Sequence, residues 1–426
     1  MKITSGIKST SQWISELTVG GSWGKTQPAS VQRNLQWFWF DGLFSSAHDN
    51  IYANYISLYV LVLGATQAQV GLMSSFSNLA AALLLLPGAF IAEHHINKHK
   101  VALFFIGGLA RFSILLLVFA PIIIKGPGVI WAAILFSVLR DSFANLGYPA
   151  WMAVTHEIVP MDGRGRYFGS RNFIMSIAGI LVTLLTGKLI TLFVGQLGYQ
   201  IALGVAFVLG ISSAFSYAHI KPDYSIPEEN SSLSLRQLVN DLKQQKTFLM
   251  LVLSAAIWNY AINVSGPFFN VHMLQTLHFN ASEIGFLNVV TVLSMLLVQN
   301  KLGSISDRHG PRKLQLISMI LIPVLPLGWI FVSQVWHIAL LNIINGILWG
   351  AYNLASFNLL LASMPKNQIS HYSAVYQVVI ALSLAFGAMT GSALIGPLTF
   401  IGLLIASIVF RVAATLVFAK FVPDSE

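Results

Sequence analysis

Cysteine is absent from this 426-residue sequence, and charged residues make up only 9% of it. Without cysteine the chain has no disulfide bond, no thiol nucleophile and no thiolate ligand for a metal. Soluble proteins carry roughly 25% charged residues, so this chain lacks the polar surface that a water-soluble fold requires. The GxxxxGK[ST] phosphate loop and the HExxH motif are also missing, and these are typical of nucleotide-binding enzymes and zinc-dependent hydrolases. We therefore expect no enzyme activity and no bound cofactor or metal.

Long apolar runs are what the sequence has instead. Hydrophobic residues make up 55% of the chain, and its mean hydropathy is +0.72. Most runs approach the ~20 residues that a helix needs to cross a bilayer, and they are too long and too continuous for transmembrane β-strands. The sequence predicts an all-α polytopic membrane protein with twelve spans, at residues 35–62, 67–91, 101–124, 128–157, 167–193, 197–219, 248–275, 282–302, 313–333, 336–362, 370–394 and 398–419.

Basic residues are distributed unequally between the two sides of this topology. Nineteen Lys and Arg residues fall in the tails and loops of one side, whereas Lys125 is the one that falls in the loops of the other. Because basic loops remain in the cytoplasm, both termini are predicted to be cytoplasmic. The net charge of +9 then reflects loops that face anionic membrane lipids, and no nucleic-acid partner is expected.

The sequence contains a weak internal repeat. A shift of 214 residues places "AQVGLMSSF" (68–76) on "SEIGFLNVV" (282–290) and Glu93 on Asp307, and a later shift of 205 places Pro160 on Pro365. Two parallel halves, related by an axis along the membrane normal, account for this pattern. The predicted organisation is a cytoplasmic tail (1–33), a six-helix bundle (34–219), a cytoplasmic linker (220–247), a second six-helix bundle (248–420) and a short tail (421–426).

The stretch "GSISDRHGPRK" (303–313) interrupts the apolar pattern at the end of the eighth span. It resembles the loop signature of the major facilitator superfamily, in which Gly, three residues, Asp, Arg, any residue and Gly precede two bases. "RGRYFGSRNF" (164–173) is similar to the loop before the fifth helix of many bacterial members. Pro311 stands where the first base is usual, and the earlier copy, "AFIAEHHINKHK" (89–100), lacks the Arg and the second Gly. The resemblance covers nearly the whole chain and implies a transporter of the bacterial inner membrane, which we expect to be monomeric.

The same stretch is a candidate conformational gate. Gly303 lets the end of the eighth span approach a neighbouring helix, and Asp307 is placed to accept hydrogen bonds from the start of the fifth span. A solvated turn that only enforces topology is the alternative. The predicted gate residues are Gly303, Asp307, Arg308, Gly310, Arg312, Glu93, Glu157 and Arg166.

Polar residues near the membrane midplane are functional candidates, because burying them there is costly. On the first span, Asp41, His48 and Asp49 lie on one helical face, and Asn259 and Asn263 of the seventh span follow from the repeat. The resemblance implies a central cavity between the halves, lined by such residues. The predicted binding and coupling residues are Asp41, His48, Asp49, Arg140, Asp141, Asn145, Asn259, Asn263, Trp349, Asn353, Tyr376 and Gln377.

The substrate class and the direction of transport stay open. The Asn, Gln, Tyr and Trp side chains suit a small polar organic solute, and Asp49 paired with Arg140 is a candidate carrier of the coupling proton; a static pair is an equal alternative. The fifth span lacks the proline of the family's drug antiporters, and Arg140 is followed by "DSFANLG", so import by proton symport is slightly favoured over export by antiport. Uniport, a non-transporting receptor or scaffold, and a membrane-embedded enzyme are further alternatives.

Overall fold

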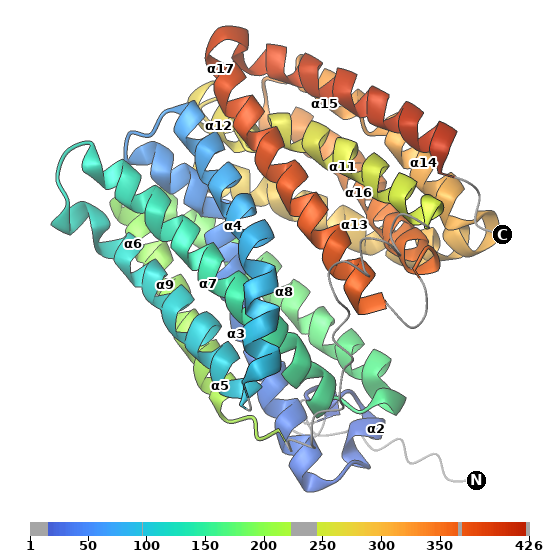
Figure 1. The fold of residues 1–426 in the computed structure, drawn as a ribbon. Coiled ribbons are helices and arrows are strands. Elements are labelled where there is room, and N and C mark those ends of the chain that lie inside the picture. Colours follow the sequence, from blue (N-terminus) through green and yellow to red (C-terminus); the bar gives the residue numbers. More distant parts are fainter. Residues whose placement is uncertain (1–15, 96, 223–244, 365–368, 423–426) are drawn as a thin grey trace, which may run out of the picture.

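The computed structural model describes residues 16–95, 97–222, 245–364 and 369–422, all of whose regular structure is helical (Figure 1). The helices of the first half are α2 (Ser22–Lys25), α3 (Ala29–Val62), α4 (Gln67–His94), α5 (Lys98–Ala102), the π-helical segment η1 (Leu103–Ala110), α6 (Arg111–Ile123), α7 (Gly128–Ile158), the 3-10 turn η2 (Met161–Gly163), α8 (Arg164–Thr191) and α9 (Leu197–Ala218).

The second half has the same overall plan. Its helices are α11 (Lys246–Ser265), α12 (Phe268–Gln275), α13 (Ala281–His309), α14 (Pro311–Leu321), α15 (Val324–Gly328), α16 (Val335–Ala362) and α17 (Ile369–Phe421). Most of the linker predicted at 220–247, and most of the short tail at 421–426, lie outside the described residues.

Nine helical segments in the described part of the chain are long and apolar enough to cross a membrane. One of them contains most of α17, whose backbone bends at Thr399 and which therefore makes two passes. The charged α3 and the short α14–α15 pair are not among the nine. The arrangement is consistent with twelve membrane passes, and it confirms the predicted all-α membrane fold.

The helix starts show the internal repeat at atomic detail. Thr66 caps α4 in a capping box with Gln69, and Asn280 caps α13 in a capping box with Glu283. In a capping box, two otherwise free backbone N–H groups at the helix start are satisfied by side chains. Both pairs are 214 residues apart, which is the shift that the sequence indicates. Equivalent helices of the two halves therefore begin at equivalent residues.

The predicted break after the eighth span lies further along the chain than expected. The helix α13 continues through Gly303 to His309, and Gly310 ends it with φ of 81°. The next helix starts at Pro311, a residue that suits the first turn of a helix because its missing N–H would be free there anyway. Nothing between 303 and 309 breaks a helix, so most of "GSISDRHGPRK" is helical rather than a loop.

The two halves lie side by side, and Figure 1 shows their helix ends spreading apart toward the N-terminus. We call this side, where α3 begins and α13 ends, the tail face, and the opposite side the far face. Within the described residues, five hydrogen bonds join the halves nearer the far face, with donor–acceptor distances of 2.5 to 3.5 Å. Their pairs are Gln67–Gln275, Ser75–Ala385, Asn270–Ser57, Asn288–Asn54 and Ser392–Ala68.

Two glycines allow the halves to meet closely near the far face. A Cβ atom built on Gly285 of α13 would lie 2.3 Å from the hydroxyl of Tyr55, and one on Gly187 of α8 would lie 2.9 Å from the Cα of Ser282. Real Cβ atoms do not approach other heavy atoms so closely. Any larger side chain at either position would therefore push the halves apart at the far face.

The segment before α3 packs against the bundle, although the sequence predicts a tail there. Thr18 and Val19 are buried, and Trp23 Nε1 donates a hydrogen bond to Asp162 Oδ2 at 3.0 Å. The hydroxyl of Ser170 donates to the carbonyl of Leu17. Residues 16–28 thus cover the tail-face ends of α7 and α8, and the first part of the predicted tail lies outside the described residues.

Candidate functional site

The helix α3 carries polar side chains on two different faces. One face holds Asp41, Ser45, Asp49 and Tyr52, which line a cavity of about 540 Å³ inside the first half. The other face holds Ser46, Asn50 and Asn54, which line a second cavity, between the halves. We call these the N-half cavity and the interhalf cavity. The 3.6-residue repeat places each set on one side of the helix.

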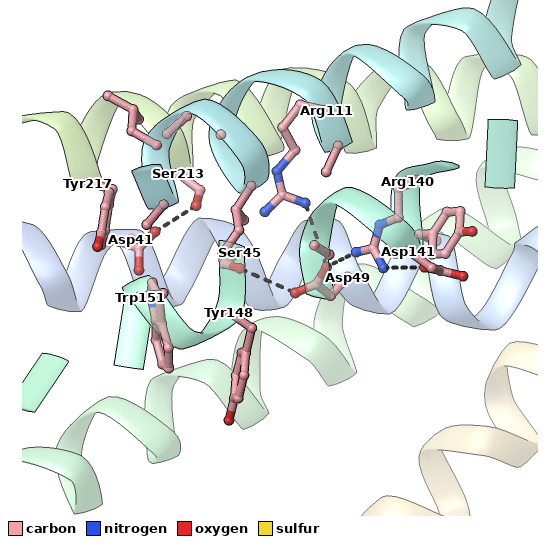
Figure 2. A pocket seen from close by; sticks show the side chains of 18 of the residues that line it. Asp41, Ser45, Asp49, Arg111, Arg140, Asp141, Tyr148, Trp151, Ser213 and Tyr217 are labelled. Atoms are coloured by element: carbon pink, nitrogen blue, oxygen red, sulfur yellow. Dashed lines mark hydrogen bonds and ion pairs between the residues drawn. The ribbon is translucent and has the colours of Figure 1, made fainter. Parts of the chain in front are cut away.

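Asp49 is at the centre of the N-half cavity (Figure 2). Its Oδ1 accepts a close hydrogen bond from Arg140 Nη2 and lies 3.7 Å from Arg111 Nη1. Its Oδ2 accepts a hydrogen bond from the Ser45 hydroxyl at 3.2 Å. About half of the Asp49 side chain (48%) is exposed to the cavity, whereas that of Arg111 is 3% exposed. The carboxylate is therefore the accessible member of a buried charge network.

Arg140 is held from three sides. Its Nη1 donates to Asp141 Oδ1 at 2.9 Å, its Nη2 binds Asp49, and its guanidinium carbon lies 4.4 Å from the centre of the Tyr52 ring. A guanidinium over an aromatic face is stabilised by the quadrupole of the ring. Asp49, the partner that the sequence suggested for Arg140, and the adjacent Asp141 both contact it.

A second ion pair lies on the same face of α3, nearer the tail face. Asp41 Oδ2 lies 3.2 Å from Arg171 Nη2, and Asp41 Oδ1 accepts a hydrogen bond from Ser213 at 2.7 Å. Arg171 also donates from Nε to the Phe38 carbonyl at 3.0 Å and lies over the Phe38 ring. Both charged residues are at most 5% exposed. This pair joins α3, α8 and α9.

The charges along the N-half cavity balance. Three carboxylates, Asp41, Asp49 and Asp141, meet three arginines, Arg111, Arg140 and Arg171. Buried charges are tolerated when they are paired in this way. Protonating one carboxylate would give the network a net positive charge. Binding a further anion in the cavity would change the net charge in the opposite direction.

The location of this cavity differs from the prediction. The expected cavity lies between the halves, but every residue that lines the N-half cavity comes from residues 41–217. Its walls are α3, the end of α5, η1, α6, α7, α8 and α9. Helical periodicity identifies which residues share a face, but it does not say which neighbouring helices that face meets. The wide turns of a π-helix are frequent at functional sites, and η1 forms part of the wall.

His48 lies behind Asp49 rather than in the cavity. Its side chain is fully buried, its Nδ1 is 2.7 Å from the carbonyl of Ala206 on α9, and its Nε2 is 3.7 Å from Asp49 Oδ1. A ring that bonds a backbone carbonyl with one nitrogen has its orientation fixed. The structure therefore gives His48 a place beside the carboxylate and no contact with the cavity.

Several predicted binding residues lie away from the N-half cavity. The amides of Asn145 and Asn259 donate to carbonyls one turn back on their own helices, and Asn263 donates to the Leu384 carbonyl on α17. Tyr376 packs against an apolar cluster around Tyr372. The exposed residues Asn353 and Gln377 line none of the three cavities described in this article.

Trp349 lines a third cavity, of about 430 Å³, which we call the C-half cavity. All but one of its lining residues come from the second half, the exception being Asn54 of α3. It shares Asn54, Asn288 and Val292 with the interhalf cavity, so these two cavities adjoin. The predicted grouping of Trp349 with Asp49 in one cavity is therefore wrong.

The predicted gate residues stand apart in this conformation. Asp307, Arg308, Glu93 and Arg166 are exposed, and nothing lies within 4 Å of a Cβ atom built on Gly303. Among the described residues, no hydrogen bond or ion pair joins Asp307 or Arg308 to α7 or α8. The expected close approach at Gly303 is absent because the helix ends spread apart at the tail face.

The remaining gate residues have other contacts. Arg312 donates to the carbonyls of Ala419 and Val422, which fastens the start of α14 to the end of α17. Glu157 is exposed near the end of α7. Gly310 supplies the positive φ that separates α13 from α14.

Sequence reasoning missed several residues of the N-half cavity. Arg111 looks structural or interfacial in an apolar run, yet it lies 3.7 Å from Asp49. Arg171 is predicted to be a loop base, yet it pairs with Asp41 within the bundle. The signal for Arg111 was present, because an ionisable residue inside a span is a functional candidate by default. The sequence does not show which residue Arg111 contacts, because that contact depends on how the helices pack.

Known proteins share both the sequence pattern and the fold of this chain. The sequence model of the Major Facilitator Superfamily matches residues 38–271 and 251–426. The chain belongs to the major facilitator superfamily. It is an integral membrane protein and a secondary transporter of a small molecule, as the resemblance in its sequence implied.

Relatives and solved structures agree with this assignment. The Lactococcus lactis subsp. lactis protein "Multi-drug resistance efflux pump PmrA homolog" is 22% identical over 394 residues, covering 91% of this chain and 94% of that one. The Salmonella typhi "Multidrug resistance protein MdtG" is 26% identical over 358 residues, covering 80% and 83%.

Two solved structures show the same fold. A bacterial homolog of the human lysosomal transporter Spinster, in an inward-facing and unoccupied conformation, aligns with a TM-score of 0.72 at 15% identity, covering 94% of this chain and 99% of that one. A bacterial homologue of the iron transporter ferroportin in the inward-facing state aligns with a TM-score of 0.71 at 14% identity, covering 93% and 100%.

Proposed function

We propose that this superfamily member exports a small organic solute from the cell in exchange for protons. The observation that carries the proposal is the position of Asp49, a half-exposed carboxylate held between Arg140 and Arg111 at the wall of a large cavity. Polar residues this deep in a membrane are expensive and mark ion and proton pathways. The relative named as an efflux pump homolog supports the direction of transport, and the relative named as a multidrug resistance protein agrees with an organic solute.

The coupling follows from competition for the arginines. When Asp49 is ionised, Arg140 and Arg111 are neutralised within the protein and Asp49 has no proton to release. When a proton binds Asp49, the arginines lose that partner and the network gains positive charge. Proton binding and the charge state of the cavity are thus linked, and each conformation that exposes Asp49 to one side exchanges its proton with that side.

The tail face is the cytoplasmic face in this proposal. The excess of basic residues in the tails and loops on this side supports the assignment, and the protein lies in the bacterial inner membrane as a monomer that contacts lipid. The conformation described above is then open to the cytoplasm and closed at the far face, where five hydrogen bonds join the halves.

Proton-coupled import is the second candidate. It is supported by the departures of this sequence from the drug antiporters, namely a fifth span without proline and "DSFANLG" after Arg140. The same Asp49 network serves either direction. In export the solute moves in the direction opposite to the proton, and in import it moves in the same direction. An experiment that measures the direction of solute movement therefore distinguishes the two.

Proteoliposomes that hold the chain with its tail face outward, and an acidic lumen, test this proposal. Protons leaving the lumen drive an antiporter to accumulate ethidium or carboxyfluorescein inside, whereas a symporter would empty the lumen of dye. We expect accumulation that is abolished when a protonophore removes the gradient, with protein-free liposomes as the control. Neither dye moving in response to the gradient would contradict proton coupling.

We also propose that Asp307 and its neighbours form a latch when the tail face closes. Asp307 is exposed in the last turn of α13, two residues before its end, where closure would bring it toward the start of α8. A carboxylate stabilises free N–H groups at a helix start, by about 0.3–1 kcal/mol when exposed. Such a contact biases the rocking equilibrium without touching the substrate.

Replacing Gly285 with Leu should close the tail face, because a side chain there collides with Tyr55 and opens the far face. Overpacking of this kind costs roughly 1–3 kcal/mol, or about fivefold or more in the equilibrium. The readout is maleimide labelling of Asn172→Cys, since Asn172 lines the interhalf cavity and the chain has no other thiol. We expect labelling from the tail face to slow.

The latch is tested by adding Asp307→Asn to this variant. If Asp307 holds the closed tail face, labelling of Asn172→Cys should speed up again. Arg166→Gln is a less direct test, and Glu283→Gln at the far end of α13 is the matched control. Equal labelling with and without Asp307 would show that the stretch serves topology alone.

A further inference from the structure

Among its described residues, the second half contains one buried cation without a counter-ion. Arg411 lies midway along the part of α17 that follows the bend at Thr399. The residue is only 4% exposed. Its Nε is buried without a hydrogen-bond partner, and its guanidinium forms no ion pair with any residue that the structure describes. Arg411 lines the C-half cavity.

The sequence of the second half explains why no partner is available. Between residues 246 and 423 the only acidic residues are Glu283 and Asp307. Glu283 is engaged in the capping box at the start of α13, and Asp307 is exposed near its other end. The three acids of the N-half cavity, Asp41, Asp49 and Asp141, are already paired with arginines. The residues that line the C-half cavity include no acid.

An unpaired buried charge is costly, and it is kept where it has a use. The other walls of the C-half cavity are those of a ligand site. Phe269, Trp329 and Trp349 provide aromatic surface, and the amide of Asn345 has no hydrogen-bond partner among the described residues. A volume of about 430 Å³ is in the range of small-molecule sites, which combine apolar walls with a few polar groups.

We propose that the C-half cavity binds an organic anion with an aromatic body, whose carboxylate is held by Arg411. This inference rests on the proposed transport function, and it names the substrate class of the same protein. Guanidinium binds carboxylate through two parallel hydrogen bonds. Asn345 supplies a further donor at the cavity wall, and the aromatic part of the solute lies against Trp329 and Trp349.

In this proposal the two halves have different roles. The first half holds the titratable Asp49 in a balanced network, and the second half holds a cation that only the solute neutralises. The C-half cavity adjoins the interhalf cavity through Asn54, Asn288 and Val292, so the solute reaches Arg411 from the open tail face. The residues that bind the solute are thus different from the residue that binds the proton.

Equilibrium dialysis of the purified full chain in nanodiscs, without any gradient, tests the proposal with 2-naphthoate and its neutral amide, 2-naphthamide. The chain should bind the carboxylate at least about tenfold more tightly, since a charged hydrogen-bonding partner contributes that much or more. Arg411→Gln should remove the preference, and Arg411→Lys should retain part of it. Arg33→Gln, which changes an exposed arginine near the start of α3, should bind as the original chain does.

Folding is checked by thermal unfolding of the same samples. Replacing an unpaired buried charge by an apolar residue is often neutral or stabilising, so Arg411→Met should melt no lower than the original chain while losing the carboxylate preference. No preference in the original chain, or a preference that survives Arg411→Gln, would overturn the proposal. A preference without gradient-driven dye movement would instead contradict the proposed function alone, and the reverse result would contradict this inference alone.

Discussion

Asp49→Asn is expected to abolish gradient-driven accumulation of dye in proteoliposomes, down to the level of protein-free liposomes. Asn has nearly the same shape and accepts a hydrogen bond from Arg140, but it binds and releases no proton. Exchange of labelled for unlabelled dye across the membrane, without a gradient, should continue. This difference follows from the position of Asp49 as the cavity-exposed carboxylate of its network.

Two control variants separate coupling from structure. Asp49→Glu keeps a titratable group and should retain gradient-driven transport at a reduced rate. Ser45→Ala removes the 3.2 Å hydrogen bond to Asp49 and leaves the carboxylate, so it should retain most of the transport. If Asp49→Asn accumulates dye as well as the original chain does, Asp49 does not carry the proton and the static ion pair is the correct interpretation.

Removing one partner of the Asp41–Arg171 pair should have the largest effect on stability. Arg171→Gln leaves the carboxylate of Asp41 buried with only the Ser213 hydrogen bond. Breaking a buried ion pair costs about 3–5 kcal/mol, which corresponds to a drop in melting temperature of roughly 3–6 °C for a chain of this length. Thermal unfolding of the purified chain in detergent measures this.

The double variant Asp41→Asn/Arg171→Gln shows whether the loss comes from the pair. With both charges gone, no uncompensated charge remains, so the double variant should be more stable than the sum of the single losses predicts. Arg164→Gln is the matched control, because Arg164 bonds only backbone carbonyls at the partly exposed end of α7. Additive losses in the double variant would show that Arg171 acts through the Phe38 carbonyl and ring alone.

Local sequence patterns were sufficient for the fold. Apolar runs of bilayer length must be helices, because lipid offers no partner for free backbone groups. The 214-residue shift found in the sequence also relates the capping boxes at Thr66 and Asn280, because a cap depends on residues three apart in the chain. The superfamily resemblance of residues 303–313 agrees with the family match. Helix ends were less certain, and α13 extends seven residues beyond its predicted end at 302.

The candidate site was predicted only in part. Periodicity places Asp41, His48 and Asp49 on one face of the first span; Asp41 and Asp49 line one cavity, whereas His48 is buried behind Asp49. The repeat also predicted Asn259 and Asn263 as binding residues, but their amides donate hydrogen bonds to backbone carbonyls instead. Equivalent positions in a weak repeat share a backbone location, but side-chain contacts depend on the packing around each one.

The sequence by itself determined that this protein crosses the membrane in two similar helical halves and that a few costly charges lie within it. Composition, span length and loop charge are properties of the chain alone, and they act through the free energy of transfer into lipid. The tertiary structure decided which charges meet. Only the packing of α3 against α6 and α7 brings Arg111 close to Asp49. Only the packing of the second half leaves Arg411 unpaired. Contacts between helices decide such pairs, because they bring together residues that are far apart in the sequence.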